Sequence, residues 1–360
     1  MAFPYERLRG SGRSVATEGR ALVFALGALT LAFVASLIDF SGTKVPLSGA
    51  GSVGVVGATA AGLFGVIAFA WGFLRANRTA RRRRGRVWRT ALDVFALTVI
   101  AAGIVTLLAA TVFAVVALAF QDFLLDPPVA AVLVGVTAAL ASYILTIVSA
   151  EVTALAIANL LALFLISGGM ASMLSASDPL WWQRNFSALG GGNGFSSYAF
   201  NVTIVFAGLA IVTLTHYLTS GLLEDAAAGE RRRIIVLRLW LVVVGLLLSG
   251  VGIVTVEEAG VAHTVIATSM AVVFGALIIA TPLLLPRLPR SFRLTSAVFV
   301  AAFAFVVLLM WPIGYFNLTA VELIGSVVLL TWLFVFVRTV VAMLEDERSA
   351  AQLEPAPPAA

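Results

Sequence analysis

Long apolar runs occupy most of this sequence. Ten runs, each close to the ~20 residues that span a bilayer core as a helix, follow one another with short polar links at 21–41, 53–74, 91–119, 129–149, 152–175, 198–219, 235–255, 264–285, 294–312 and 318–342. Inside lipid, a backbone must satisfy its hydrogen bonds within its own segment, so these runs are expected to be helices. The sequence therefore predicts an all-α fold, a polytopic transmembrane helix bundle with ten spans.

The composition supports a membrane protein and excludes several kinds of chemistry. Hydrophobic residues make up 61% of the chain and charged residues 11%, whereas about a quarter of a soluble domain is charged. The chain has no cysteine, which excludes disulfides, thiolate catalysis and cysteine-based metal sites. The first run is followed directly by further spans and by no small-residue cleavage site, so it is not expected to be a signal peptide.

Arginine is distributed unevenly between alternate links. If the N-terminus is cytoplasmic, all but four of the 23 basic residues fall in the links and ends on the inner side. The four others are Lys44, Arg184, Arg238 and Arg338. Cytoplasmic loops carry the excess of Lys and Arg in membrane proteins. The sequence therefore predicts a multi-pass protein of the cell membrane with both termini in the cytoplasm.

Four parts are predicted along the chain. They are a cytoplasmic N-terminal segment at 1–20, a four-span part at 21–149, a six-span unit at 152–342 and a disordered cytoplasmic tail at 343–360. The tail is expected to be disordered because it is polar and rich in Pro and Ala. In the second run, Gly54, Ala58 and Gly62 recur every four residues, which predicts a face where helices pack closely.

A run of arginines at 78–86 stands out among the links. It contains Arg81, Arg82, Arg83 and Arg84 beside an apolar run. We expect these side chains to fix the topology by contacting anionic lipid head groups. Since the basic charge lies beside membrane spans, no nucleic-acid partner is predicted.

Ionisable residues are absent from the centres of the predicted spans. Glu322 falls at the outer end of the last span, and Arg238 and Arg338 fall at inner ends. An ion-coupled carrier generally needs charged groups near the middle of the membrane. This placement counts against such a carrier, although a secondary transporter or flippase component remains an alternative.

Polar residues gather instead in three predicted outer links. We interpret them as one pocket for a lipid head group or small amphiphile, with Arg184 as the phosphate-pairing cation and Glu257, Glu258 and His263 as the opposite wall. The candidate residues are Asp178, Arg184, Asn185, Ser187, Asn193, Asn201, Glu257, Glu258, His263, Tyr315 and Asn317. The competing interpretation is structural: Trp181, Trp182 and Tyr198 belong to an interfacial aromatic belt, and the glycines form turns.

The stretch "SALGGGNGFSSYAFNVTIVFAGLAIV" at 187–212 carries a family resemblance. Its Ser-x-Leu-Gly loop at 187–190, its Phe-Asn pair at 200–201 and the later His263 resemble a bacterial family catalogued as domain of unknown function 998, which is similar to the eukaryotic Frag/DRAM/Sfk-like six-span proteins. The resemblance covers about 152–342 and leaves the first four spans unexplained. It implies a six-span unit with a role in lipid handling, and no settled reaction.

The sequence thus predicts an integral plasma-membrane protein of unassigned activity that binds lipid head groups or a small amphiphile, and it favours a non-enzymatic role while leaving an enzyme open. It indicates no catalytic residues, no metal ligands and no cofactor. A membrane-embedded hydrolase remains an alternative, with Ser187, His263 and a nearby glutamate as its triad. The oligomeric state stays open.

Overall fold

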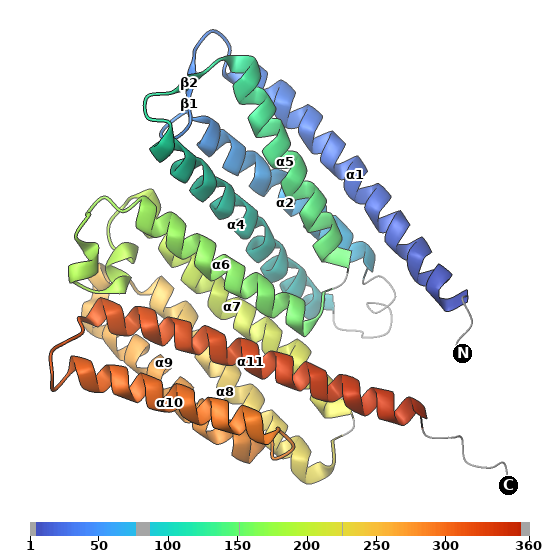
Figure 1. Cartoon of the computed structure of the whole chain (residues 1–360), viewed down its shortest axis with the longest axis vertical. Helices are drawn as coiled ribbons and strands as arrows, with labels where there is room; N and C mark the ends of the chain where they lie inside the picture. Colours follow the sequence, from blue (N-terminus) through green and yellow to red (C-terminus); the bar gives the residue numbers. More distant parts are fainter. Residues whose placement is uncertain (1–4, 77–86, 151, 225, 354–360) are drawn as a thin grey trace. The chain divides into compact units, whose positions relative to one another are not determined.

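A computed structural model describes residues 5–76, 87–150, 152–224 and 226–353, shown in Figure 1. Within these residues, 10 helices are long and apolar enough to cross a membrane. This confirms the predicted class, an all-helical multi-pass membrane protein with ten spans. The described chain divides into two compact units.

Unit 1 contains four long helices and a small two-stranded sheet. Its elements are α1 (Tyr5–Asp39), β1 (Val45–Pro46), α2 (Val53–Ala76), α4 (Val87–Ala119), β2 (Leu124–Leu125) and α5 (Pro127–Ala150). Helix α5 packs against α1 and α2, and α2 packs against α4. The two strands pair antiparallel, with Val45 opposite Leu125.

Small residues on α2 set the close packing of unit 1. A Cβ on Gly54 would lie 2.8 Å from the Leu47 carbonyl oxygen, and one on Gly65 would lie 2.9 Å from Leu145. Gly62 leaves room for the Thr106 side chain, and Ala58 is buried. The packing face predicted from the four-residue spacing is confirmed, because a larger side chain at these positions would push α2 away from its neighbours.

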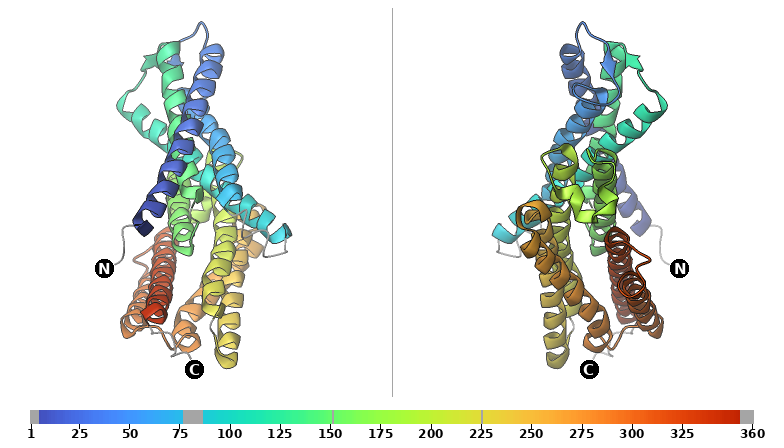
Figure 2. Two further views of the ribbon diagram at one scale, coloured as in Figure 1. Left: turned by 90° about the vertical axis from the view of Figure 1, so that its right-hand side faces the viewer. Right: turned by 90° about the vertical axis from the view of Figure 1, so that its left-hand side faces the viewer.

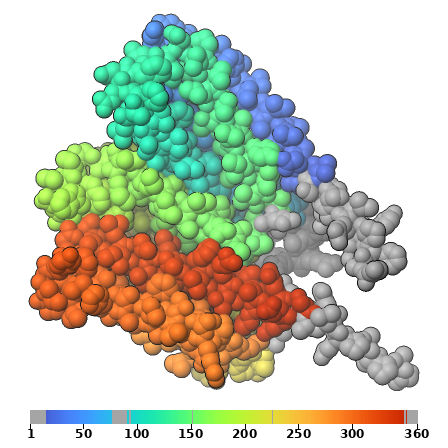
Figure 3. Space-filling view, in the orientation of Figure 1, coloured from blue at the N-terminus to red at the C-terminus, as the bar shows by residue number. Residues whose placement is uncertain are grey.

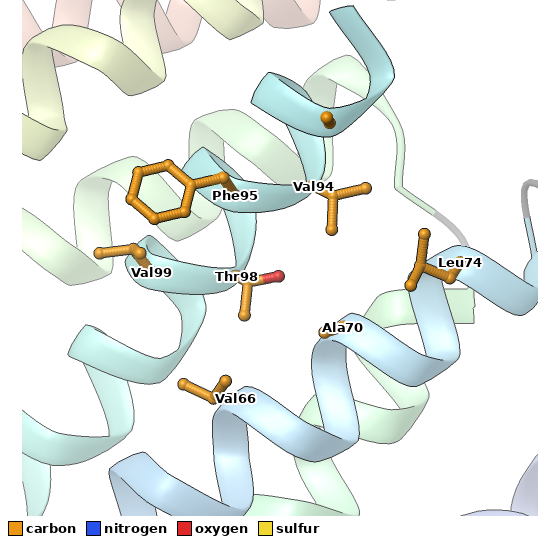
Figure 4. A pocket seen from close by; sticks show the side chains of 8 residues that line it. Val66, Ala70, Leu74, Val94, Phe95, Thr98 and Val99 are labelled. Carbon is orange, nitrogen blue, oxygen red and sulfur yellow. The ribbon is translucent and has the colours of Figure 1, made fainter. Parts of the chain in front are cut away.

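A hollow of about 420 Å³ lies between α2 and α4 (Figure 4). Its walls are aliphatic and aromatic side chains, including Val66, Leu74 and Phe95. Thr98 contributes a hydroxyl, and its buried Oγ1 has no hydrogen-bond partner among the described residues. The hollow offers little polar chemistry, so we do not treat it as a functional site.

Unit 2 contains five long helices and the loop that precedes them. Its elements are η1 (Trp181–Gln183), η2 (Phe186–Gly190), α7 (Phe195–Glu224), α8 (Ala228–Ile253), α9 (Val256–Leu284), α10 (Arg290–Met310) and α11 (Leu318–Leu353). Helices α7 and α8 run side by side (Figure 2). Their backbones approach closely at Gly208 and Gly245, and the Ser249 hydroxyl donates to the Val205 carbonyl at 2.9 Å.

An aromatic cluster joins α9, α10 and α11. Trp332 is fully buried, stacks on Phe336 with centroids 5.2 Å apart, and meets the edge of Phe274 at 5.5 Å. Its indole N–H donates to the Ser296 hydroxyl at 3.0 Å. The surfaces of α10 and α11 lie side by side in Figure 3. Leu294 on α10 is 68% exposed, as expected for a helix whose outer face meets lipid.

Two boundaries differ from those predicted. The fifth span is α6 (Ala154–Leu174), which groups with unit 2 up to Ala162 and with unit 1 from Leu163. The division therefore falls within this helix, not between a four-span part and a six-span unit. Helix α11 continues to Leu353, so the beginning of the predicted disordered tail is helical. Residues 354–360 and Arg81 to Arg84 lie outside the described residues.

Arginines gather at one end of unit 2. The first turns of α8 and α10 and the link between α9 and α10 carry Arg231, Arg232, Arg233, Arg287, Arg290 and Arg293. Arg287 forms ion pairs with Glu230 of α8 and Glu347 of α11, which ties these segments together. The opposite end of unit 2 holds the loop with Arg184. By the positive-inside rule, the first end is predicted to face the cytoplasm.

The absence of cysteine makes this orientation directly testable. We expect a membrane-impermeant maleimide to label Asn193→Cys on intact cells and to leave Ser291→Cys unlabelled, because both side chains are exposed at opposite ends of unit 2. After permeabilisation, both variants should be labelled. Labelling of Ser291→Cys alone on intact cells would invert the predicted topology.

Candidate functional site

The loop before α7 is a folded structure. It forms two short 3-10 helices, η1 and η2, and its aromatic side chains pack on α7. Phe186 lies 6.1 Å from Trp181 and meets Phe200 edge to face at 5.2 Å, centroid to centroid. Trp182 and Tyr198 are exposed, in keeping with the predicted aromatic belt.

Glu322 holds the beginning of η2. Its carboxylate accepts hydrogen bonds from the backbone N–H groups of Phe186 and Ser187. The first N–H groups of a helix have no partner within it, and the side chain of Asn185, which precedes η2, does not supply one. The Glu322 carboxylate of α11, which is far away in the sequence, therefore caps the N-terminus of η2.

Asn201 and Ser197 of α7 hold the end of η2. The Asn201 amide donates to the Gly190 carbonyl at 2.8 Å, and the Ser197 hydroxyl donates to the same oxygen at 2.6 Å. A Cβ on Gly190 would lie 2.8 Å from the Phe200 ring, so only glycine fits here without a shift. These contacts give a structural reason for the glycine of the Ser-x-Leu-Gly loop and for the Phe-Asn pair at 200–201.

The three predicted outer links converge. The Gly192 N–H, at a residue with φ of 80°, donates to Glu257 of α9 at 2.8 Å. The Asn317 amide donates to the Trp182 carbonyl at 2.9 Å, while its Oδ1 caps α11 by accepting from the Ala320 N–H. The loop before α7 thus contacts the first turns of both α9 and α11, as the sequence predicted.

Arg184 has a carboxylate partner. Its Nη2 lies 2.9 Å from Oδ2 of Asp178, and Oδ1 of the same carboxylate accepts the Leu180 N–H at 2.9 Å. The two charged side chains are 52% and 47% exposed, and such surface pairs contribute about 0–1 kcal/mol. Asp178 neutralises this cation locally, so the structure gives no support to a free phosphate-binding arginine here.

His263 is a buried residue of α9, 5% exposed. The helix is kinked at Ala259, and the His263 Nδ1 lies 2.6 Å from the Val254 carbonyl oxygen. A carbonyl only accepts hydrogen bonds, so Nδ1 must carry a proton. The imidazole also lies within electrostatic range of Glu322.

Two buried polar atoms near Glu322 lack hydrogen-bond partners among the described residues. They are Oδ1 of Asn185, which directly precedes Phe186, and Oγ1 of Thr319, one helical turn before Glu322. Thr319 is 3% exposed. Buried polar atoms without partners are uncommon and call for an explanation, such as water or a ligand.

Other candidate residues stay at the surface. Asn193, Glu258 and Tyr315 are exposed, and Tyr315 is 74% exposed. Ser187 is half-buried and takes part through its backbone N–H. In a hydrolytic triad a carboxylate orients Nδ1 of the histidine, but in this structure the Val254 carbonyl holds that position.

Sequence reasoning left Glu322 and Thr319 out of the candidate site. The signal for Glu322 was present, because an acid within an apolar span is costly unless it has partners. Thr319 gave no comparable signal, since a threonine in an apolar helix usually bonds to its own backbone.

No known protein-family model matches the chain, and no curated protein or solved structure is significantly similar to it. The resemblance to the bacterial family of unknown function therefore stays a prediction.

Proposed function

We propose that this chain is an integral membrane protein that binds the polar head of a membrane lipid or small amphiphile. The binding site would lie at one end of unit 2, where the loop before α7 contacts the first turns of α9 and α11. The observation that carries this proposal is a pair of buried atoms without hydrogen-bond partners among the described residues, Asn185 Oδ1 and Thr319 Oγ1. Asn185 directly precedes Phe186, and Thr319 lies one helical turn before Glu322, the two residues that join η2 to α11. The site would lie at head-group depth, near the exposed Trp182 and Tyr198.

The available atoms favour a ligand that donates hydrogen bonds. Asn185 Oδ1 and the Glu322 carboxylate are acceptors, and a threonine hydroxyl can also accept. Glu257 and Glu258 add negative charge at the rim, while Arg184 is paired with Asp178. A primary ammonium or a hydroxyl-bearing head group suits this arrangement better than a bare phosphate.

Neither alternative has an observation in its favour. The triad position of the orienting carboxylate is held by a backbone carbonyl, which gives a hydrolase no support. A transporter would need a polar path along unit 2, whereas Trp332, ten residues along α11 from Glu322, is fully buried among aromatic rings.

Two phospholipids provide a matched test of this proposal. Phosphatidylethanolamine and phosphatidylcholine share the phosphate, but only the first has N–H donors. We expect the purified full-length protein to retain phosphatidylethanolamine preferentially in native mass spectrometry. Thr319→Val should lower that retention about fivefold, the equivalent of one hydrogen bond of about 1 kcal/mol.

Thr319→Val removes a hydroxyl that has no partner among the residues that the structure describes, so the fold should keep its stability. Glu258→Gln serves as a control for rim charge and should change retention less than Thr319→Val does. Equal retention of the two lipids, or an unchanged preference in a folded Thr319→Val variant, would contradict the proposal.

A further inference from the structure

A groove opens at the arginine-rich end of unit 2. It has a volume of about 550 Å³ and is lined by the second half of α11 and the link between α9 and α10. Ala342 and Met343 form an apolar part of its wall, and Arg338, Asp346 and Arg287 contribute charged groups. The groove is separate from the site proposed above, since it lies at the opposite end of α11 from Glu322 and Thr319.

Arg287 is fully engaged in holding the groove together. Its Nε and Nη2 donate to Glu230 of α8, and its Nη1 donates to Glu347 of α11 at 2.9 Å. The hydrogen bond that Arg287 donates to Glu230 is the largest cause that raises the pKa of Arg287 above its usual value. Burial opposes this effect, while the charges of Glu230 and Glu347 and the hydrogen bond to Glu347 add to it. This guanidinium therefore stays charged but offers little free capacity to a ligand.

Arg338 is the cation that the groove leaves available. It is exposed, lines the groove and forms no ion pair within the part of the chain that the structure describes. It lies about 20 residues after Leu318, the beginning of α11, which corresponds to about 30 Å along a helix. That length matches the thickness of a bilayer core, so Arg338 reaches the level of the lipid phosphates at this end.

We propose that this groove binds the phosphodiester of a membrane phospholipid, with Arg338 as the pairing cation. An arginine at the boundary of the hydrocarbon needs a counter-ion or water, and its planar guanidinium fits two phosphate oxygens at once. The apolar wall at Ala342 and Met343 accommodates the rest of the head group. Asp346 and Glu347 keep the groove from being strongly cationic, and inorganic phosphate has no acyl chains to anchor it. Inorganic phosphate is therefore not expected to compete with the phospholipid.

The test compares lipid retention by full-length variants in detergent, using native mass spectrometry with phosphatidylglycerol added. We expect Arg338→Gln to lower retention about tenfold, as fits the loss of a charge-assisted hydrogen bond. Arg290→Gln is the matched control, because Arg290 is exposed on the first turn of α10 and does not line the groove. It should retain lipid like the unmodified protein.

A second variant tests the groove without removing charge. Ala342→Trp places a large side chain on an exposed position of the wall and should also lower retention. Retention unchanged in both folded variants would overturn the proposal, as would full displacement of the lipid by millimolar inorganic phosphate. If Arg338→Gln does not fold, Ala342→Trp alone decides the matter.

Discussion

The Gly245→Val variant is expected to lose about 3 kcal/mol of unfolding free energy, at the upper end of the cost of overpacking. A Cβ at this position would lie 2.6 Å from the Gly208 carbonyl oxygen and 2.9 Å from Val212. The nearest atom belongs to the backbone of α7, so a side-chain rotation cannot relieve the clash, and the two helices must separate. Denaturation of the detergent-solubilised protein, followed by tryptophan fluorescence, measures the effect.

The matched control should shift stability in the opposite direction. Gly275 also lies within a long helix, α9, but a Cβ there would have no neighbour within 4 Å. Gly275→Ala should therefore stabilise the protein by up to about 1 kcal/mol through helix propensity alone. If Gly245→Val unfolds at the same denaturant concentration as the unmodified protein, the close packing of α7 and α8 is not what stabilises unit 2.

The spans were predictable because a bilayer imposes one length and one kind of backbone structure on a chain. Ten apolar runs became ten helices, and a four-residue repeat of small residues on α2 became a packing face. The close pair Gly208 and Gly245 was not predicted. Each glycine stands in a different helix, and a single sequence does not indicate which helices pack together.

Part of the site was predictable for a similar reason. Links on one side of a compact bundle emerge close together, and the contacts of Glu257 with Gly192 and of Asn317 with Trp182 confirm that expectation. The individual roles were harder to predict. Arg184 and Asp178 are six residues apart, and their pairing depends on the turn formed by η1.

The two ends of α11 present different chemistry to lipid. Near Leu318, the available atoms are acceptors around Glu322 and Asn185, which suits a donor such as an ammonium. In the second half of α11, the available group is the Arg338 guanidinium, which has only donors and suits a phosphate. The two proposals are therefore independent: Arg338→Gln should leave the preference for phosphatidylethanolamine over phosphatidylcholine unchanged.

Glu322→Ala is expected to destabilise the protein by about 3 kcal/mol, because hydrogen bonds to a charged group contribute about 1.5–3 kcal/mol each and two half-buried N–H groups lose their acceptor. The Phe186 and Ser187 N–H groups begin η2, so the loop before α7 should loosen first. Faster amide hydrogen exchange confined to 185–192, measured by mass spectrometry, would show this directly.

Two further variants separate the contribution of Glu322 to stability from the contribution of its charge. Glu322→Gln keeps a side-chain carbonyl that can accept from η2, so it should retain most of the stability that Glu322→Ala loses, while lowering affinity for an ammonium head group. Glu258→Ala should change stability by less than about 1 kcal/mol, because its carboxyl is exposed and contributes mainly through the dipole of α9. If Glu322→Ala leaves both the stability and the exchange of 185–192 unchanged, then α11 does not organise this loop, and the proposed site loses the residue at its centre.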